Sequence, residues 1–307
     1  MTAQQPGAAL GRWLGAVVSW LGAVVKTARP RQWPKNLLVL AAPIAGASLG
    51  RDDGAAYALV AVVAFTAASS AVYFVNDVLD AERDRQHPKK RYRPVASGAL
   101  APGQALAVAA VLVLAALAAG AWIGEPLLSL TIAAYLVISF AYSLFLKHVP
   151  VVELACVASG FVLRALGGAA ATHVPPSGWF LTVVSLGAMV VAVNKRRGEL
   201  ATLGPEAAAR HRPVMRWYRF GTLSALAQVL AMAMIASYAL WAVGNGDGWA
   251  HIWHLVSVIP LALALVRFDW LAGQGDGRPV EDLMVKDRPM IVAEMAWLAL
   301  FALGLSS

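Results

Sequence analysis

The sequence predicts an all-α, polytopic membrane protein, and three observations support this fold class. The chain is 59% hydrophobic and only 14% charged, with a mean hydropathy of +0.64, well above the usual range of soluble domains. Apolar runs of the roughly 17–25 residues that cross a bilayer recur along the chain. Nearly all Lys and Arg residues fall in segments that would lie on one side of the membrane.

Nine apolar runs predict nine transmembrane helices around a central cavity. They occupy residues 36–50, 55–77, 101–121, 127–146, 150–171, 178–195, 217–243, 250–268 and 289–305, and the first is the shortest. The N-terminal stretch AALGRWLGAVVSWLGAVV lacks the basic start and cleavage site of a signal peptide. We therefore expect residues 1–30 to form an amphipathic surface segment.

The charge distribution predicts the orientation. If the N-terminus is cytoplasmic, all 25 Lys and Arg residues are cytoplasmic except Arg51 and Arg164. The external turns RDDG, IGEP, THVPPSG and GNGDGWA hold acids and almost no bases. The net charge of +8 therefore reflects topology and an anionic membrane face, and it does not indicate nucleic-acid binding. The single cysteine, Cys156, excludes an internal disulfide and a Cys metal site, so we interpret it as a packing residue.

Three cytoplasmic segments, 78–100, 196–216 and 269–288, are too long and too charged to be simple turns, so function is expected there. The first two are distantly alike. Asn76 precedes the Arg-Pro pair at 93–94 by 17 residues, and Asn194 precedes the pair at 212–213 by 18. This pattern favours two four-helix halves followed by a ninth helix. The two loops would then face each other across one cytoplasmic cavity.

Acidic residues end the second predicted helix. Asn76, Asp80 and Asp84 are four residues apart, and Asp77 lies three before Asp80, so on a continuing helix they share one face. Carboxylates gathered in this way repel one another unless a cation joins them. Hard oxygen donors suit Mg²⁺, which completes its shell with water and substrate phosphates. The alternative is a solvated helix end whose acids pair with nearby bases.

A basic run follows the acids directly, formed by His87, Lys89, Lys90, Arg91 and Arg93. By itself such a run is typical of a cytoplasmic anchor. Beside an Mg²⁺ site it also suits a diphosphate, whose remaining oxygens need cationic donors. His87, which precedes Pro88, is either a base or a residue that orders the loop and binds phosphate.

Further charged residues occur at the same predicted side or within the membrane. Glu153 and Arg164 lie on one stripe of the fifth helix, and charges inside a membrane usually line a cavity. Two further candidates, Tyr142 and Lys147, close the fourth helix. The 6–7 loop NKRRGEL supplies Lys195, Arg196, Arg197 and Glu199. The 8–9 loop, which is either a lid or an ordinary solvated loop, supplies Asp282, Lys286, Asp287 and Arg288.

The motif NDVLDAERD, with RPRQWPKNLLVLAAP at 29–43 and YSLFLK at 142–147, resembles the UbiA superfamily of intramembrane prenyltransferases. The resemblance covers nearly the whole chain and implies a nine-helix UbiA-like domain over 31–307, at the plasma membrane, with its active site facing the cytoplasm. It implies Asp77, Asp80 and Asp84 as catalytic residues and, with Asn76, as Mg²⁺ ligands. A homo-oligomer, specifically a trimer, is suggested by the resemblance alone.

One departure from the family pattern bears on the substrate. The 6–7 loop KRRGELATLGPEAAARHRP lacks a second aspartate-rich motif, and bases take its place. Together with FVLRALGG and PVEDLMVKDR, this is similar to the branch that transfers 5-phosphoribosyl from phosphoribosyl diphosphate (PRPP) to decaprenyl or another polyprenyl phosphate in cell-wall arabinan synthesis. The alternatives are prenyl transfer to an aromatic or quinone precursor, which predicts indifference to PRPP, and a transporter for an anionic solute.

A base-rich pocket suits PRPP and a lipid phosphate, which together bring three phosphate-bearing groups. The attacking lipid phosphate is already an anion, so no strong general base is needed. The expected phosphate and ribose contacts are Lys35, Lys89, Arg91, Arg93, Tyr142, Lys147, Arg164, Lys195 and Arg196, with Glu199 as a further metal or ribose contact.

Overall fold

A computed structural model describes residues 6–245, 247–275, 277–278 and 280–306, and the regular secondary structure in this part of the chain is entirely helical. Eight of its helices are long and apolar enough to cross a membrane. They are α3 (Gly54–Leu79), α5 (Pro102–Trp122), α6 (Pro126–Leu144), α7 (Val152–Ala171), α8 (Gly178–His211), α9 (Phe220–Gly244), α10 (Gly248–Gly273) and α12 (Arg288–Ser306). Each coincides with one of the predicted spans, so the all-α membrane fold is confirmed.

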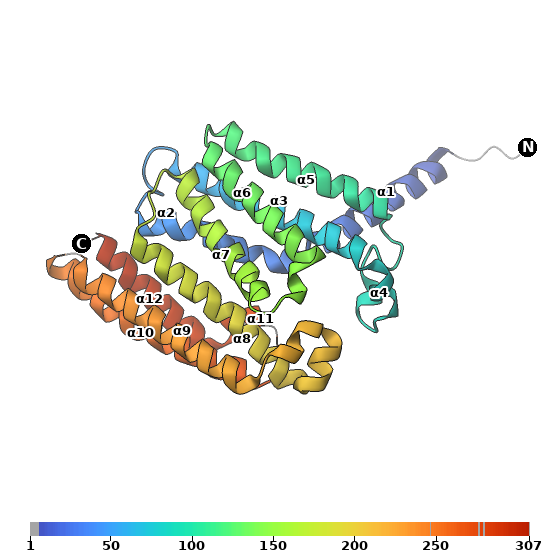
Figure 1. Ribbon diagram of the computed structural model, residues 1–307. Helices are drawn as coiled ribbons and strands as arrows, with labels where there is room; N and C mark the ends of the chain where they lie inside the picture. Colours follow the sequence, from blue (N-terminus) through green and yellow to red (C-terminus); the bar gives the residue numbers. More distant parts are fainter. Residues whose placement is uncertain (1–5, 246, 276, 279, 307) are drawn as a thin grey trace, which may run out of the picture.

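Residues 36–50, predicted to form the first transmembrane α-helix, do not form one continuous α-helix in the structure. That helix is replaced by the 3-10 helix η1 (Pro30–Leu40) and the short helix α2 (Ala41–Ala45). Pro34 and Pro43 explain the change, because proline lacks a backbone N–H and disfavours an α-helical turn before it. The rises of 3-10 and α-helices give η1 and α2 together a length of roughly 30 Å. Figure 1 shows them running from the α1 end of the molecule to the opposite end.

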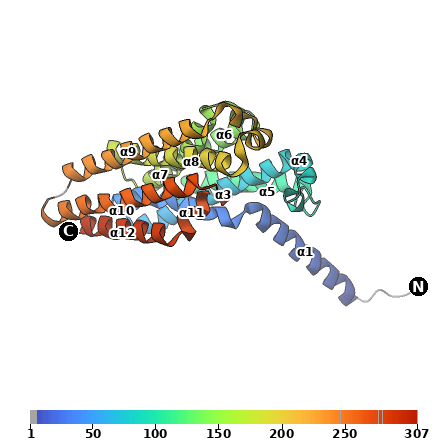
Figure 2. The same ribbon diagram turned by 90° about the horizontal axis from the view of Figure 1, so that it is seen from below.

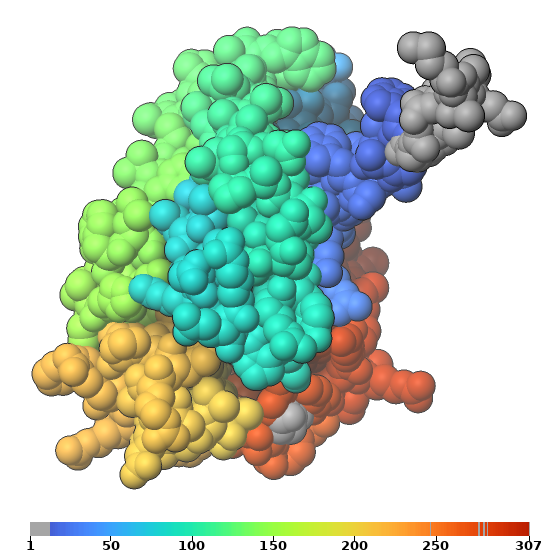
Figure 3. Space-filling view, turned by 90° about the vertical axis from the view of Figure 1, so that its right-hand side faces the viewer, coloured from blue at the N-terminus to red at the C-terminus, as the bar shows by residue number. Residues whose placement is uncertain are grey.

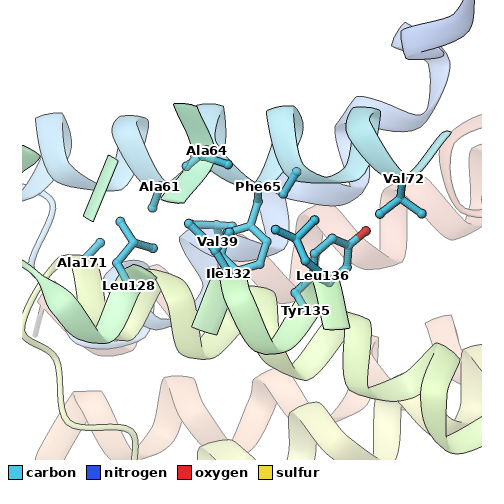
Figure 4. Packing of buried hydrophobic residues seen from close by; sticks show 12 residues of the cluster. Val39, Ala61, Ala64, Phe65, Val72, Leu128, Ile132, Tyr135, Leu136 and Ala171 are labelled. Carbon is cyan, nitrogen blue, oxygen red and sulfur yellow. The ribbon is translucent and has the colours of Figure 1, made fainter. Parts of the chain in front are cut away.

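Helix α7 lies in the middle of the bundle and packs against η1. A Cβ atom at Gly168 would overlap the carbonyl oxygen of Val39, so this glycine permits the close approach. One apolar cluster joins η1, α3, α6 and α7, with Phe65 and Tyr135 edge to face at 5.7 Å (Figure 4). The irregular backbone of η1 is thereby partly covered by protein, the setting in which non-helical backbone is tolerated at membrane depth.

The charged segments that were expected to be loops are largely helical. Residues 78–100 contain α4 (Ala81–Gln86) and η2 (Lys90–Tyr92). Helix α8 continues through most of 196–216 to His211, with a kink at Gly204 (φ 73°) before Pro205, and η4 (Pro213–Trp217) follows. Residues 269–288 include the end of α10 and helix α11 (Val280–Lys286), while Asp276 and Pro279 lie outside the described residues.

These segments gather at one end of the molecule. Figure 1 shows α4 and the segment after the α8 kink at the end from which α1 (Pro6–Ala28) projects, and Figure 3 looks onto that end. Figure 2 shows α1 leaving the bundle obliquely. Residues 1–5 of the predicted amphipathic segment lie outside the described residues. The short helix η3 (Leu146–His148) joins α6 to α7.

Candidate active site

The acidic set lies where α3 passes into α4. Asp80 closes α3, and its N–H donates to the carbonyl of Asn76 at 2.9 Å; the Asp84 N–H donates to the carbonyl of Asp80 at 2.9 Å. The helical path therefore continues through the junction in its i to i+4 register. This keeps Asn76, Asp80 and Asp84 on one face, as their spacing predicts.

Two arginines bind the outer members of the acidic set. Arg29, just before η1, donates to Oδ1 of Asp77 at 2.5 Å, and Arg93 lies 3.4 Å from the same oxygen. Arg93 also donates to Oδ2 of Asp84 at 2.6 Å. The Asp77 side chain is 2% exposed, and Arg29 is 30% exposed. The nearly buried carboxylates are thus paired, as buried charges must be.

The acidic set fits a hard divalent cation. The arginines contact only one oxygen of Asp77 and one of Asp84, and among the described residues none donates a hydrogen bond to the Asp80 side chain. The described residues contain no group of three or more acidic, His or Cys side chains gathered as a metal site. Mg²⁺ does not need one, because one or two carboxylates and substrate phosphates suffice.

The basic run after α4 is ordered by His87. Its Nδ1 accepts the backbone N–H groups of Lys89 at 3.1 Å and Lys90 at 3.3 Å. His87 was interpreted either as a base or as a residue that orders the loop, and these two hydrogen bonds support the loop-ordering role. The Lys89 and Arg91 side chains are exposed, and Arg91 lies over the Tyr92 ring. Two predicted phosphate contacts are thus presented to solvent.

A second charged cluster surrounds Arg196 at the same end of the molecule. Its Nε and Nη2 atoms bind Glu153 at 2.6–3.0 Å, and Nη1 binds Glu199 at 2.6 Å. The Tyr142 hydroxyl accepts from Arg196 at 3.2 Å and from Arg212 at 2.8 Å. Arg196 is 1% exposed and Glu153 is fully buried. Every nitrogen of Arg196 donates to a protein acceptor. The predicted direct contact between Arg196 and a phosphate would therefore need a nitrogen that is not available here.

Sequence reasoning did not name Arg212 or Tyr218 as site residues, and it did not identify Glu153 as the partner of Arg196. Arg212 lies 3.9 Å from Glu153 and 4.0 Å from Glu199. The Tyr218 hydroxyl accepts the Val151 N–H at 3.0 Å, where Val151 has the left-handed φ of 65° that a β-branched residue rarely adopts. Burial raises the pKa of Tyr218. The Arg-Pro repeat could have pointed to Arg212.

Arg164 lies deeper in the bundle and forms a separate polar node. It donates to the Asn36 side chain at 2.7 Å, to the Gly160 carbonyl at 2.6 Å and to the Tyr135 hydroxyl at 3.2 Å. Asn36 in turn donates to Thr66 at 3.0 Å. The node therefore ties η1 to α3, α6 and α7. As with Arg196, all three nitrogens of Arg164 already have protein acceptors.

The two charged clusters are connected across the end of the molecule. His211, at the end of α8, interacts electrostatically with Lys90 and His87 of the first loop and with Glu199 of the second cluster. The predicted facing of the two loops is consistent with this proximity. Lys35, Lys147 and Lys195 are half-buried, and Lys35 and Lys195 have interaction partners of their own.

The segment 269–288 is tied to the bundle by two Arg–Asp pairs. Arg197 binds the carboxylate of Asp269 at 2.6 Å and also its carbonyl oxygen. Arg267 donates to Asp287 at 2.9 and 3.1 Å, and Asp287 caps α12 through the Met290 N–H. This pairing lowers the pKa of Asp287. Helix α11 packs through buried Val280 and Leu283, so this part of the chain is neither a bare solvated loop nor an open lid.

An apolar surface hollow lies away from both charged clusters. It encloses about 570 Å³ between α3 and α5, is apolar, and is lined by Leu59, Val63 and Trp122 among others. Leu59 is roughly 27 Å along α3 from Asp77 at the helical rise. A hollow of this kind, on an apolar outer face, is typical of a lipid contact and has no charged groups for a phosphate.

Comparison with known proteins agrees with the fold and the motifs. The sequence pattern described as the UbiA prenyltransferase family matches residues 36–286. The chain is 40% identical over 280 residues to the decaprenyl-phosphate phosphoribosyltransferase of Mycobacterium tuberculosis, covering 90% of this chain and 92% of that protein. It is 33% identical to the protein of the same name from Corynebacterium glutamicum, covering 89% and 84%.

Solved structures show the same architecture. The structure of a UbiA homologue from Archaeoglobus fulgidus bound to GPP and Mg²⁺ superposes with a TM-score of 0.69 at 15% identity, covering 92% of this chain and 98% of that one. A homologue from Aeropyrum pernix gives a TM-score of 0.54 at 17% identity, covering 87% and 98%. The chain belongs to the UbiA prenyltransferase family.

Proposed function

We propose that this chain transfers 5-phosphoribosyl from PRPP to decaprenyl phosphate. In this reaction an oxygen of the lipid phosphate bonds to the anomeric carbon of the ribose, and the bond from that carbon to the diphosphate breaks. Diphosphate leaves with the electron pair. The proposal rests on one combination of features. The acidic end of α3 has carboxylate oxygens that the arginines leave free, the base-rich segment of α8 lies near it, and the chain resembles phosphoribosyltransferases over nine-tenths of its length.

Asn76, Asp77, Asp80 and Asp84 would hold Mg²⁺, with Asp80 as the most open donor. When bound, the cation would neutralise the leaving diphosphate as positive charge develops on the ribose. The Mg²⁺ found with a UbiA homologue supports this assignment. The chain's own contribution at this end is to fix the carboxylates, which Arg29 and Arg93 do by binding one oxygen each of Asp77 and Asp84.

The bases divide into two proposed roles. Lys35, Lys89, Arg91, Arg93, Lys147 and Lys195 would bind the phosphates of the two substrates. Arg196 and Arg164 would act by position: Arg196 fixes the hydroxyl of Tyr142 and the carboxylate of Glu199, and Arg164 holds η1 against the bundle. Tyr142 and Glu199 would then contact the ribose.

The proposed setting follows from charge and apolar surface. We place the protein in the plasma membrane with the N-terminus and active site cytoplasmic, since the base-rich segments share one end. Helix α1 would lie among membrane lipids at that surface, as an N-terminal segment attached to the domain over 31–307. Small residues on exposed helix faces permit close packing between copies, and a homotrimer is proposed on the family resemblance. The product would serve cell-wall arabinan synthesis.

The test is an assay of the detergent-solubilised protein with labelled PRPP and Mg²⁺. One tube holds decaprenyl phosphate, and a second holds 4-hydroxybenzoate with a prenyl diphosphate. We expect labelled lipid in the first tube and no prenylated product in the second. Product in the second tube alone would contradict the proposal and indicate aromatic prenyl transfer. If neither tube gives product, anion transport would be the next activity to measure.

A further inference from the structure

The junction between α1 and η1, where the stretch RPRQWPKN begins, contacts the acidic helix end. Lys26 donates to the carbonyl of Tyr92, next to Arg93, at 2.9 Å. The Ala28 carbonyl accepts from Trp33 at 3.0 Å and from Ser70 at 3.3 Å. Contacts to η1, α3 and the loop after α4 therefore fix this short stretch of backbone from three directions.

Arg29 stands at this junction in the left-handed conformation, with φ 53° and ψ 66°. That conformation costs free energy for any residue with a Cβ atom, and it persists where surrounding contacts impose it. Its result here is that the Arg29 side chain reaches α3, where it lies over the Tyr73 ring at 4.6 Å and binds Asp77. A strained residue held over the predicted reaction site is a candidate for function.

The guanidinium of Arg29 remains available for a ligand. Among the described residues only its Nη2 atom has a hydrogen-bond acceptor, and the side chain is 30% exposed. Arg93, which approaches the same oxygen of Asp77, likewise engages only one nitrogen within the described part of the chain. Arg164 and Arg196, by contrast, engage all three. Two half-open guanidinium groups thus flank one buried carboxylate.

We propose that Arg29 is a phosphate-binding residue of the donor site, held in place by Asp77 and paired with Arg93. Its free N–H edge matches the oxygens of a diphosphate, which arginine binds in a bidentate manner. Asp77 orients the group and offsets its charge before the ligand arrives. The assignment rests on the proposed function for the identity of the donor, but the anion-binding role can be measured without turnover.

The test compares Arg29→Gln, Arg29→Lys and the matched control Arg31→Gln with the wild-type protein. Arg31 lies two residues away and is exposed, and the control removes the same charge. We expect Arg29→Gln to raise the KM for PRPP about tenfold or more, the loss of one charge-assisted hydrogen bond. The KM for the lipid phosphate and the kcat should change less than about threefold, Arg29→Lys should recover part of the loss, and Arg31→Gln should match the wild type.

A binding measurement separates this proposal from the proposed function. Inorganic diphosphate with Mg²⁺ should raise the Tm of the wild type and of Arg31→Gln, and should raise that of Arg29→Gln much less. Ribose 5-phosphate should stabilise all three equally. If the wild type binds diphosphate but does not turn over PRPP, only the proposed function fails. If Arg29→Gln binds diphosphate like the wild type, or loses Tm and both KM values together, Arg29 is a structural residue and the inference is overturned.

Discussion

The predicted membrane spans within α3 and α8 end near residues 77 and 195, and the charged clusters at these two ends share a plan but carry opposite charges. At the end of α3 the helix supplies the acids, and arginines return to them from the chain before and after it. At the end of the span within α8 the helix supplies the arginines Arg196 and Arg197, and acids reach them from α7 and α10. Arg93 and Arg212 of the two Arg-Pro pairs both fold back onto the acids of their own cluster.

The difference between the two ends lies in what remains open. Within the described part of the chain, the α3 end keeps an unpaired carboxylate in Asp80 and unbonded guanidinium nitrogens in Arg29 and Arg93, whereas every nitrogen of Arg196 in α8 has a protein acceptor. Unsatisfied, part-exposed groups can exchange protein partners for a ligand at little cost, and buried satisfied ones cannot. We therefore expect metal and diphosphate binding at the first end, and at the second a buried arginine that positions Tyr142 and Glu199.

The largest expected effect is loss of activity at the open end. Asp80→Asn removes the open carboxylate, and we expect kcat/KM for PRPP to fall about 1000-fold, the upper range for deleting one electrostatic contributor to a transition state. The Tm should change little, because this carboxylate has no partner among the described residues. Initial rates at several Mg²⁺ concentrations measure the first effect, and thermal unfolding in detergent the second.

The control for that change is Glu82→Gln. Glu82 is a 77% exposed acid two residues along the chain, and Arg85 is its ion-pair partner. It should leave turnover within about twofold, as for most surface ion pairs. If both variants lost the same amount of activity, the rate would depend on the total negative charge of this segment and not on the position of Asp80.

The closed end should respond in stability. Glu153→Gln leaves Arg196 buried with Glu199 as its nearest remaining acid, and breaking a buried pair by removing one partner costs about 3 kcal/mol. We expect a marked loss of Tm, read from thermal unfolding in detergent. Glu206→Gln, which breaks a pair that is 93% and 75% exposed on the same helix, should cost less than about 0.5 kcal/mol. An unchanged Tm in Glu153→Gln would contradict the supporting role of this buried pair.

The sequence was sufficient for the helical membrane fold and for the position of the acidic set. Hydropathy located α3 to within a few residues, and helical spacing placed Asn76, Asp80 and Asp84 on one face. These are properties of short segments, which periodicity reports directly. The 3-10 form of η1 was missed because apolar length was weighed above the breaks that its prolines impose.

Partners across long sequence distances were not predictable in the same way. Glu153 and Arg196 are 43 residues apart, and Arg29 and Asp77 are 48 apart. A single sequence shows a charge but not what neutralises it, so Arg196 and Arg164 were expected to bind phosphate. Burial decides between the two roles, since an arginine enclosed by acids and carbonyls has no nitrogen left for a ligand.

The smallest expected effect belongs to a pair outside both ends. Asp287→Asn keeps an oxygen for the α12 cap but removes the charge that Arg267 binds. Because the pKa of Asp287 is held below its ordinary value of 3.8, the stability it contributes is present above that value and is lost as the pH falls through its lower, folded-state pKa. The difference in Tm between wild type and Asp287→Asn should thus be small and constant from about pH 5 to 8, and should vanish only in acid below about pH 4. A difference that varied near neutral pH would implicate another titrating group, with His211 between the two clusters as the first to replace.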